Sequence, residues 1–199
     1  QLLLTEFVDL KEGDWMIQSA ANSAVGMYLV QLAKTRGVNV VSVVRRESAV
    51  ADLKAIGADV VIVDSPDLAK DVKAATGAKM KLAVDAVAGD TAGRLADTLE
   101  RGGTLVNYGG MSNQPSALGA AALIFNDVVV RGFWLVLWFE KASKEERMGV
   151  YAALTQAVAK GELHAPIDKV FTLDEIAEAA RYSWAGGRSG KVLVAPNGI

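Results

Sequence analysis

The chain has 199 residues, and its 21 Lys and Arg nearly balance its 23 Asp and Glu, which argues against a nucleic-acid binder that relies on a basic surface. It has no cysteine and a single histidine, His164, so disulfides, cysteine-ligated zinc, thiol nucleophiles and histidine-rich metal sites are excluded. Hydrophobic residues make up 51% of the chain, enough to bury a core.

Apolar runs alternate with longer amphipathic stretches along the first two thirds of the chain. The apolar runs predict strands over 15–18, 38–44, 60–63, 82–85, 104–108 and 128–131. Helical spacing predicts helices over 24–36, 48–56, 68–75 and 90–100, with a Gly102-Gly103 turn before the fifth strand. Nearly continuous apolar strands separated by single helices predict a parallel α/β sheet, doubly wound and covered by helices on both faces. We expect this Rossmann domain to span residues 1–139.

The pattern changes after about Glu140. Helices are predicted over 144–160 and 174–184, loops over 162–166 and 186–190, and a last strand over 191–194. Thr172 or Asp174 is placed to cap the second of these helices. Residues 140–199 contain too few predicted strands for a core of their own, so we expect them to pack against another domain.

Two features of the sequence lead us to expect a further domain. One is the apolar residues of this segment, and the other is the start of the chain. Leu163, Phe171 and Trp184 are expected to expose apolar surface in its absence. The run from Gln1 to Thr5 has neither Met nor a helix cap ahead of its leucines, and we expect a segment upstream. No apolar run reaches the ~20 residues that span a bilayer, and no signal peptide is apparent.

The first strand is followed by a loop of small residues, Ser19 to Gly26. When it is aligned on the G-x-G-x-x-G fingerprint, Ala21, Ser23 and Gly26 occupy the glycine positions. Small residues let a pyrophosphate approach the helix N-terminus, and Asn22 tolerates a left-handed conformation. An ordinary small-residue turn is the alternative.

Two arginines follow the second strand, where NAD-binding proteins place an acidic residue for the ribose 2′-hydroxyl. Arg45 and Arg46 can instead clamp a 2′-phosphate, which favours NADP over NAD. A solvated basic turn is the alternative, and Glu47 is placed to pair with one arginine.

Four segments carry a family resemblance. They are Asn22–Gly26 (NSAVG), Val43–Arg45 (VVR), Arg101–Met111 (RGGTLVNYGGM) and Arg131–Leu135 (RGFWL). The chain resembles the medium-chain dehydrogenase/reductase superfamily, most closely its mitochondrial-type trans-2-enoyl thioester reductases and next its quinone oxidoreductases. The resemblance covers essentially the whole chain.

The resemblance implies an NADPH-binding domain that works beside an N-terminal GroES-like catalytic domain, without zinc. The implied reaction, in fatty acid synthesis, adds hydride to C3 and a proton to C2 of an enoyl-CoA or enoyl-acyl-carrier-protein. The implied cofactor-binding residues are Asn22, Ser23, Ala24, Val25 and Gly26 near the pyrophosphate, Arg45 and Arg46 at the 2′-phosphate, Tyr108, Gly109, Gly110 and Met111 beside the nicotinamide ribose, Phe133, Trp134 and Leu135 around the nicotinamide, and Lys191 from the last strand.

The sequence departs from the family in two places. The family often has Arg-x-Arg where this chain has Arg45-Arg46-Glu47. The family's catalytic tyrosine lies in the N-terminal domain, and none of the four tyrosines here matches it. We therefore expect no catalytic residue in this chain, which alone would be incomplete and inactive.

Several alternatives stay open at this stage. A quinone or alkenal reductase and a non-catalytic nucleotide-binding module are the rival functions. The run from Phe133 to Trp138 could equally form core, dimer interface or pocket wall, Lys191 could lie on the surface, and Asp85 could merely cap a turn. His164 has no expected partner and no expected chemistry.

The resemblance implies an enoyl thioester substrate and a homodimer paired near the sixth strand. No nucleic acid or membrane partner is expected. The expected location is the cytoplasm, or the mitochondrial matrix in a eukaryote.

Overall fold

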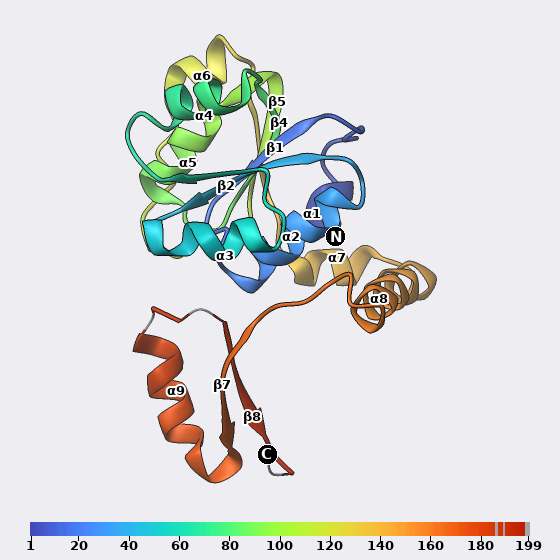
Figure 1. Cartoon of the computed structure of the whole chain (residues 1–199). Coiled ribbons are helices and arrows are strands. Elements are labelled where there is room, and N and C mark those ends of the chain that lie inside the picture. The colour runs from blue at the N-terminus through green and yellow to red at the C-terminus, as the bar shows by residue number, and fades with distance from the viewer. Residues whose placement is uncertain (186, 189, 198–199) are drawn as a thin grey trace.

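Six strands of this computed structural model, which describes residues 1–185, 187–188 and 190–197, form one parallel sheet. They are β1 Trp15–Gln18, β2 Asn39–Val44, β3 Val60–Val63, β4 Met80–Asp85, β5 Leu99–Asn107 and β6 Val129–Gly132. Their order is β3-β2-β1-β4-β5-β6 (Figure 1). The chain builds outward from β1 to β3, then crosses back to place β4 on the other side of β1. The predicted doubly wound parallel sheet is confirmed.

Short helices cover both faces of this sheet. They are α1 Leu2–Thr5, α2 Ala24–Lys34, α3 Val50–Ala55, α4 Leu68–Thr76, α5 Gly89–Ala96 and α6 Ala120–Ile124. Buried apolar residues of the first three belong to the core on one face, and those of the last three, which in α6 are Ala122 alone, belong to the core on the other. A 3-10 turn, Glu47–Ala49, precedes α3. Both faces of the central strands are therefore dry, which explains their uninterrupted apolar sequence.

The predicted helix over 90–100 is too long. Helix α5 ends at Ala96, and β5 already begins at Leu99, where it pairs with Met80 of β4. The predicted turn Gly102-Gly103 lies inside β5, with the Gly102 amide donating to the Asn126 carbonyl at 2.8 Å. The sequence misleads because Leu95, Ala96 and Leu99 are all buried, so the apolar pattern runs on past the helix end.

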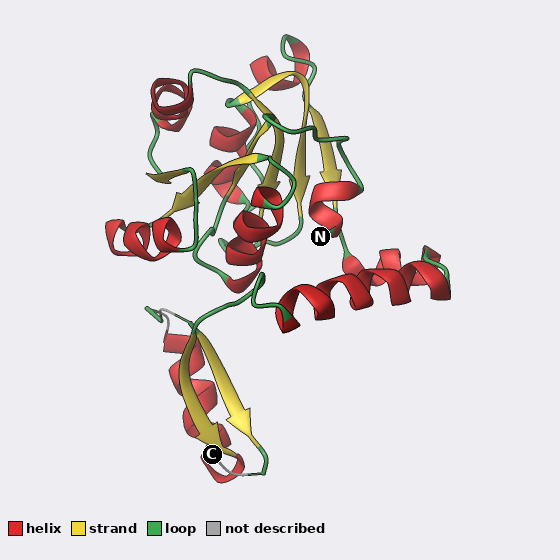
Figure 2. Cartoon of the chain, turned by 45° about the vertical axis from the view of Figure 1, so that its right-hand side comes forward, coloured by secondary structure: helices red, strands yellow, loops and turns green. Residues whose placement is uncertain are grey.

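The remainder of the chain forms α7 Leu135–Lys141, α8 Lys144–Ala159, β7 Ile167–Thr172, the 3-10 turn η2 Leu173–Glu175, α9 Ile176–Ala185 and β8 Lys191–Ala195. Strands β7 and β8 pair in parallel as a separate two-stranded sheet, with α9 in the crossover between them. Figure 2 shows this β7-α9-β8 unit standing apart from the main sheet and connected by a loop to α8. Strand β7 was not predicted from the sequence, since its pattern of half-exposed residues is weak.

The small unit has a buried centre of its own. Phe171 is 1% exposed and packs against the Tyr182 ring, with 5.8 Å between centroids. Leu163 is also buried, so the expectation that these two residues expose apolar surface is wrong. The same expectation is confirmed for Trp184, whose side chain is 92% exposed. Thr172 caps η2 through a capping box with Glu175. It is one of the two residues that the sequence predicted as the cap of this helical segment.

Candidate functional site

The loop between β1 and α2 is shaped for an anion. Ala20 adopts a left-handed conformation with φ of +47°, which turns the chain sharply after the strand. Ser23 caps α2 by accepting a hydrogen bond from the Gly26 amide at 3.1 Å. The amides of Ala24 and Val25 have no intrahelical acceptor, since they belong to the first turn of the helix. This end of α2 therefore offers free donors and the positive end of the helix dipole.

Gly26 is fixed by close packing of α2 on this loop. A Cβ atom at this position would lie 2.4 Å from the Ala21 carbonyl oxygen, which no real Cβ tolerates. Close packing thus demands the one surviving glycine of the fingerprint, but against the loop after β1 and not against the strand that the sequence predicted.

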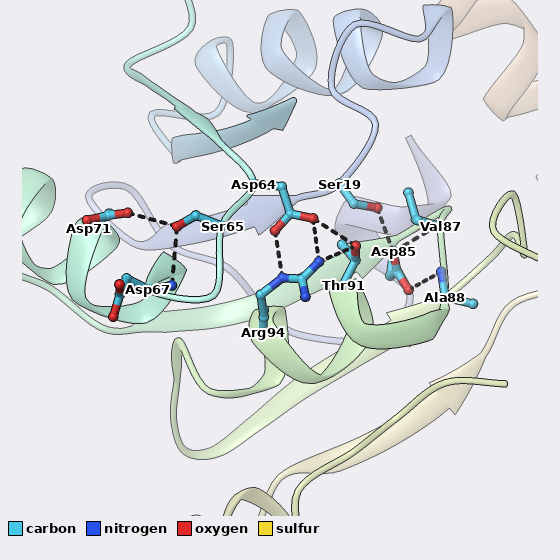
Figure 3. A network of polar contacts seen from close by, with 10 residues as sticks. All are labelled: Ser19, Asp64, Ser65, Asp67, Asp71, Asp85, Val87, Ala88, Thr91 and Arg94. Atoms are coloured by element: carbon cyan, nitrogen blue, oxygen red, sulfur yellow. Dashed lines mark hydrogen bonds and ion pairs between the residues drawn. The ribbon is translucent and has the colours of Figure 1, made fainter. Parts of the chain in front are cut away.

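Asp85 anchors the same loop from β4. Its fully buried carboxylate accepts hydrogen bonds from the Ser19 hydroxyl at 2.6 Å, from the Val87 and Ala88 amides at 2.9 Å each, and from the Asn107 side chain at 3.0 Å. The Ser19 hydroxyl in turn accepts from the Ala86 amide at 2.9 Å. Figure 3 shows Asp85 turned toward Ser19 and the following turn. Asp85 thus caps that turn, as one reading of the sequence allowed, and joins the ends of β1, β4 and β5.

A cavity of about 480 Å³ opens where β1 and β2 end and reaches Val87 after β4, so it lies beside the reversal of strand order between β1 and β4. Seven of the predicted cofactor-binding residues line it: Asn22, Ser23, Ala24, Arg45, Arg46, Met111 and Lys191. The structure thus brings the small-residue loop, the two arginines and the last strand together around one space.

The lining of this cavity is strongly cationic. Arg45, Arg46, Arg188 and Lys191 face one acidic residue, Asp64. Asp64 is itself bound by Arg94, whose two nitrogens donate to the two carboxylate oxygens at 2.8 and 2.7 Å. This hydrogen bonding raises the pKa of Arg94 above its ordinary value. The cavity therefore suits a multiply charged anion.

Eight predicted residues lie outside the lining, and their assignment to the cofactor stays a prediction. They are Val25, Gly26, Tyr108, Gly109, Gly110, Phe133, Trp134 and Leu135. A Cβ on Gly109 would lie 2.9 Å from the Ala86 carbonyl oxygen, so this glycine serves close backbone packing, whereas Gly110 faces open space. Phe133 stacks edge-on against Phe7 with 5.7 Å between centroids.

Tyr108 is partly buried, and its hydroxyl has no hydrogen-bond partner among the described residues. Burial, reinforced by the nearby charge of Asp85, raises the pKa of Tyr108 to about 12. This phenol therefore stays neutral at physiological pH and has the character of a packing residue.

The cavity also contains residues that sequence reasoning missed. Asp64, Thr91, Ser112 and Arg188 all line it. Asp64 follows β3 as Arg45 follows β2, so the rule that ligands bind at strand ends could have found it. Arg188 lies in the predicted loop over 186–190, of which positions 186 and 189 are outside the described residues. Its Nε atom is buried and has no hydrogen-bond partner in the part of the chain that the structure describes.

The predicted pairing of Glu47 with an arginine is not found. Within 1–185, 187–188 and 190–197, no ion pair joins Glu47 to Arg45 or Arg46. Neither arginine has an ion-pair partner among the described residues.

A side-chain clamp attaches the C-terminal segment to α2. The Gln31 amide donates to the His164 carbonyl and accepts from the His164 amide, both at 2.8 Å. His164 therefore does have a partner, through its backbone, contrary to expectation. The clamp holds the loop that carries Ala165 and Pro166, both in the cavity lining. The Lys191 amide then donates to the Pro166 carbonyl at 2.7 Å, which brings the start of β8 to the same place.

Comparison with protein families matches residues 24–149 to the family described as zinc-binding dehydrogenase. The chain belongs to this family. The resemblance to the medium-chain dehydrogenase/reductase superfamily, and within it to enoyl thioester reductases, is confirmed. A mitochondrial enoyl-[acyl-carrier-protein] reductase of Dictyostelium discoideum is 37% identical over 201 residues, covering 97% of this chain and 57% of that protein.

Two solved structures agree with this assignment. The mitochondrial 2-enoyl thioester reductase Etr1p/Etr2p heterodimer from Candida tropicalis has a TM-score of 0.83 at 28% identity, over 93% of this chain and 56% of that one. The Etr1p/NADP/crotonyl-CoA complex has a TM-score of 0.86 at 28% identity, over 98% of this chain and 57% of that one. The chain spans about half the length of the curated relatives it matches.

The zinc in the family's name does not fit the residues of this chain. The sequence has no cysteine and one histidine. Across the described residues, no group of three or more His, Asp or Glu side chains could hold a metal ion. The same part of the chain contains no helix both long enough and apolar enough to cross a membrane.

Proposed function

We propose that this chain forms the NADPH-binding part of an enoyl thioester reductase. The observation that carries the proposal is the cationic cavity where β1 and β2 end, lined by Arg45, Arg46, Arg188 and Lys191. NADPH carries a pyrophosphate and a 2′-phosphate, and the cavity offers a helix N-terminus for the first and paired guanidinium groups for the second. Arg188 contributes a buried nitrogen that still lacks an acceptor among the described residues.

In this proposal the chain binds and orients the cofactor, which supplies the hydride. Asn22, Ser23 and the first amides of α2 hold the pyrophosphate, and Arg45 and Arg46 hold the 2′-phosphate. Lys191 approaches from β8, whose position depends on the Gln31–His164 clamp. Fixing the dinucleotide in one geometry is the contribution to rate that such a domain makes.

We propose that the groups which bind the thioester and deliver the proton lie outside these 199 residues, so that the chain alone is inactive. None of its tyrosines occupies the position of the family's catalytic tyrosine. The substrate of the whole protein is then an enoyl-CoA or enoyl-acyl-carrier-protein. The relatives whose names say mitochondrial support a matrix location if the source is eukaryotic.

We further propose that two copies pair through β6. This strand is the edge of the main sheet, and all four of its residues are exposed, Val129 and Val130 among them. An apolar edge strand is a template for pairing with an identical strand, which gives a two-fold symmetric dimer. Sedimentation of the wild type and Val130→Lys tests this: we expect a dimer that the lysine dissociates.

Calorimetric titration of the chain with NADPH and NADH tests the cofactor assignment. We expect NADPH to bind at least roughly tenfold more tightly, because each charge-assisted phosphate contact contributes about 1.5–3 kcal/mol. Arg45→Ala should remove most of this preference. Arg101→Ala, an exposed arginine outside the cavity lining, should leave it unchanged. Equal affinity for both dinucleotides would contradict NADPH specificity.

Turnover by the complete protein tests the substrate. Crotonyl-CoA should be reduced with NADPH at a higher kcat/KM than a quinone. A preference for the quinone would support a quinone or alkenal reductase instead. Binding of NADPH with no turnover of either acceptor would support a non-catalytic nucleotide-binding module.

A further inference from the structure

An acidic side chain lies beside the arginines of the cavity. Asp64 directly follows β3, and its backbone amide donates to the Val44 carbonyl at 2.8 Å. Arg45 directly follows Val44, so Asp64 and Arg45 are neighbours at adjacent strand ends. The Asp64 side chain is 14% exposed and belongs to the cavity lining. A free carboxylate here would work against the binding of an anion.

Helix α5 prevents this by engaging both oxygens of Asp64. Arg94 donates from Nε to one oxygen at 2.8 Å and from Nη2 to the other at 2.7 Å, while the Thr91 hydroxyl donates to the second at 2.9 Å. Arg94 Nη2 also donates to the Thr91 hydroxyl at 3.1 Å, which closes a three-residue ring (Figure 3). Arg94 itself does not line the cavity.

We propose that Arg94 is a positioning residue that sets the preference for the 2′-phosphorylated dinucleotide by holding Asp64 away from Arg45 and Arg46, an inference that rests on the proposed function. A bidentate guanidinium both neutralises the carboxylate and fixes its direction. Without Arg94, Asp64 either pairs with Arg45 or repels the 2′-phosphate. Both effects weaken the binding of NADPH and not that of NADH, because only NADPH has a 2′-phosphate. That phosphate needs Arg45, and a carboxylate repels it.

The experiment measures binding of adenosine 2′,5′-bisphosphate and adenosine 5′-monophosphate to the 199-residue chain by calorimetry. These probes differ by the 2′-phosphate and need no group from elsewhere in the protein. The variants are Arg94→Gln, Asp64→Asn and the two combined, with Arg94→Lys as the conservative replacement. Thermal unfolding of each variant reports whether it is folded.

We expect Arg94→Gln to lower the affinity for the bisphosphate roughly tenfold, about the effect of losing one charge-assisted phosphate contact. The affinity for the monophosphate should change less than about twofold. Adding Asp64→Asn should restore the wild-type ratio of the two affinities, since it removes the charge that Arg94 controls. Arg94→Lys, which keeps the charge without the fork, should give an intermediate ratio.

A ratio unchanged in Arg94→Gln overturns the inference. So does an equal loss for both probes, or a loss that Asp64→Asn does not reverse, because each points to a structural role for the ring. If Arg94→Gln does not fold, the double variant and Arg94→Lys still decide, by a wild-type ratio in the first and a reduced one in the second. A wild-type chain with no preference for the bisphosphate contradicts the proposed function and this inference with it.

Discussion

The main sheet and the β7-α9-β8 unit are both built from parallel strands joined by a helix, yet they differ in what they can hold in place. Strands β1 and β4 are covered on both faces, and every residue from Met16 to Gln18 is buried. In β7, Phe171 is buried, whereas its neighbours along the strand are half-exposed or exposed. Helix α8, with 16 residues, has no buried residue in the described part of the chain.

The difference teaches where precise polar geometry can be built. A sheet covered on both sides excludes water from Asp85 and Ser19, so their hydrogen bonds are strong and the loop they hold is fixed. The one-sided unit supplies Lys191 and Arg188 to the cavity but depends on the Gln31–His164 clamp for its position. We therefore expect substitutions of the same kind to have large effects in the sheet and small ones in the segment.

Removing an aspartate should show the largest contrast. Asp85→Ala leaves four donors without this acceptor, in two buried and two partly buried hydrogen bonds, and we expect it to lower the free energy of unfolding by more than about 3 kcal/mol. Asp174→Ala, at an exposed position of η2, should change it by less than about 0.5 kcal/mol. Urea unfolding followed by circular dichroism measures both. Similar losses for the two variants would break the distinction between the regions.

The sequence predicted the main sheet well because burial on both faces leaves a strong signal. All six strands were located from their apolar runs, and the sheet's order follows the rules for crossovers. Strand β7 was not predicted because it is half-exposed. Helix α5 was predicted to end too late because Leu99 of the next strand continues its apolar pattern. Local pattern thus predicts strands that are buried on both faces, and it fails where a strand is half-exposed or where the apolar pattern of one element continues into the next.

The cavity was predicted only in part, for a related reason. Residues that follow the first and second strands, such as Ser23 and Arg45, stand at positions where a fingerprint applies, and they do line the cavity. Asp64 follows β3 and could have been found by the same rule of strand ends, whereas Thr91 comes from α5 and Arg188 from a loop far along the chain. Contacts of this kind depend on tertiary packing, which spacing along the sequence does not encode.

Adding one methyl group to a helical glycine should change stability in opposite directions in the two regions. Gly26→Ala places a Cβ 2.4 Å from the Ala21 carbonyl oxygen, and we expect it to lower the free energy of unfolding by about 1–3 kcal/mol. Gly149→Ala lies on α8, where a Cβ meets nothing within 4 Å, and should raise it by about 0.5–1 kcal/mol. Thermal unfolding gives both signs. A stabilising Gly26→Ala would mean that α2 can move off the loop.

Removing a tyrosine hydroxyl should give the smallest effects at neutral pH and reveal the contrast only in alkali. The pKa of Tyr108 is about 12 in the folded chain, above its ordinary value near 10, because the phenol is buried. Between pH 10 and pH 12 the unfolded chain therefore releases this proton while the folded chain keeps it. The free energy of unfolding should fall across this range, with roughly 1–2 kcal/mol of the loss due to Tyr108.

Tyr108→Phe should abolish that part of the alkaline loss and cost little at pH 8, since the hydroxyl has no partner within the described residues. Tyr182→Phe is the matched variant in the C-terminal segment. The pKa of Tyr182 is also raised, but by its hydrogen bond to Asp168 at 2.7 Å on an exposed side chain. Its removal should leave the alkaline loss close to that of the wild type, because water screens an exposed pair. Urea unfolding at pH 8, 10 and 11.5 tests both, and a Tyr108→Phe variant as alkali-sensitive as the wild type would show that this phenol is hydrated in the folded chain.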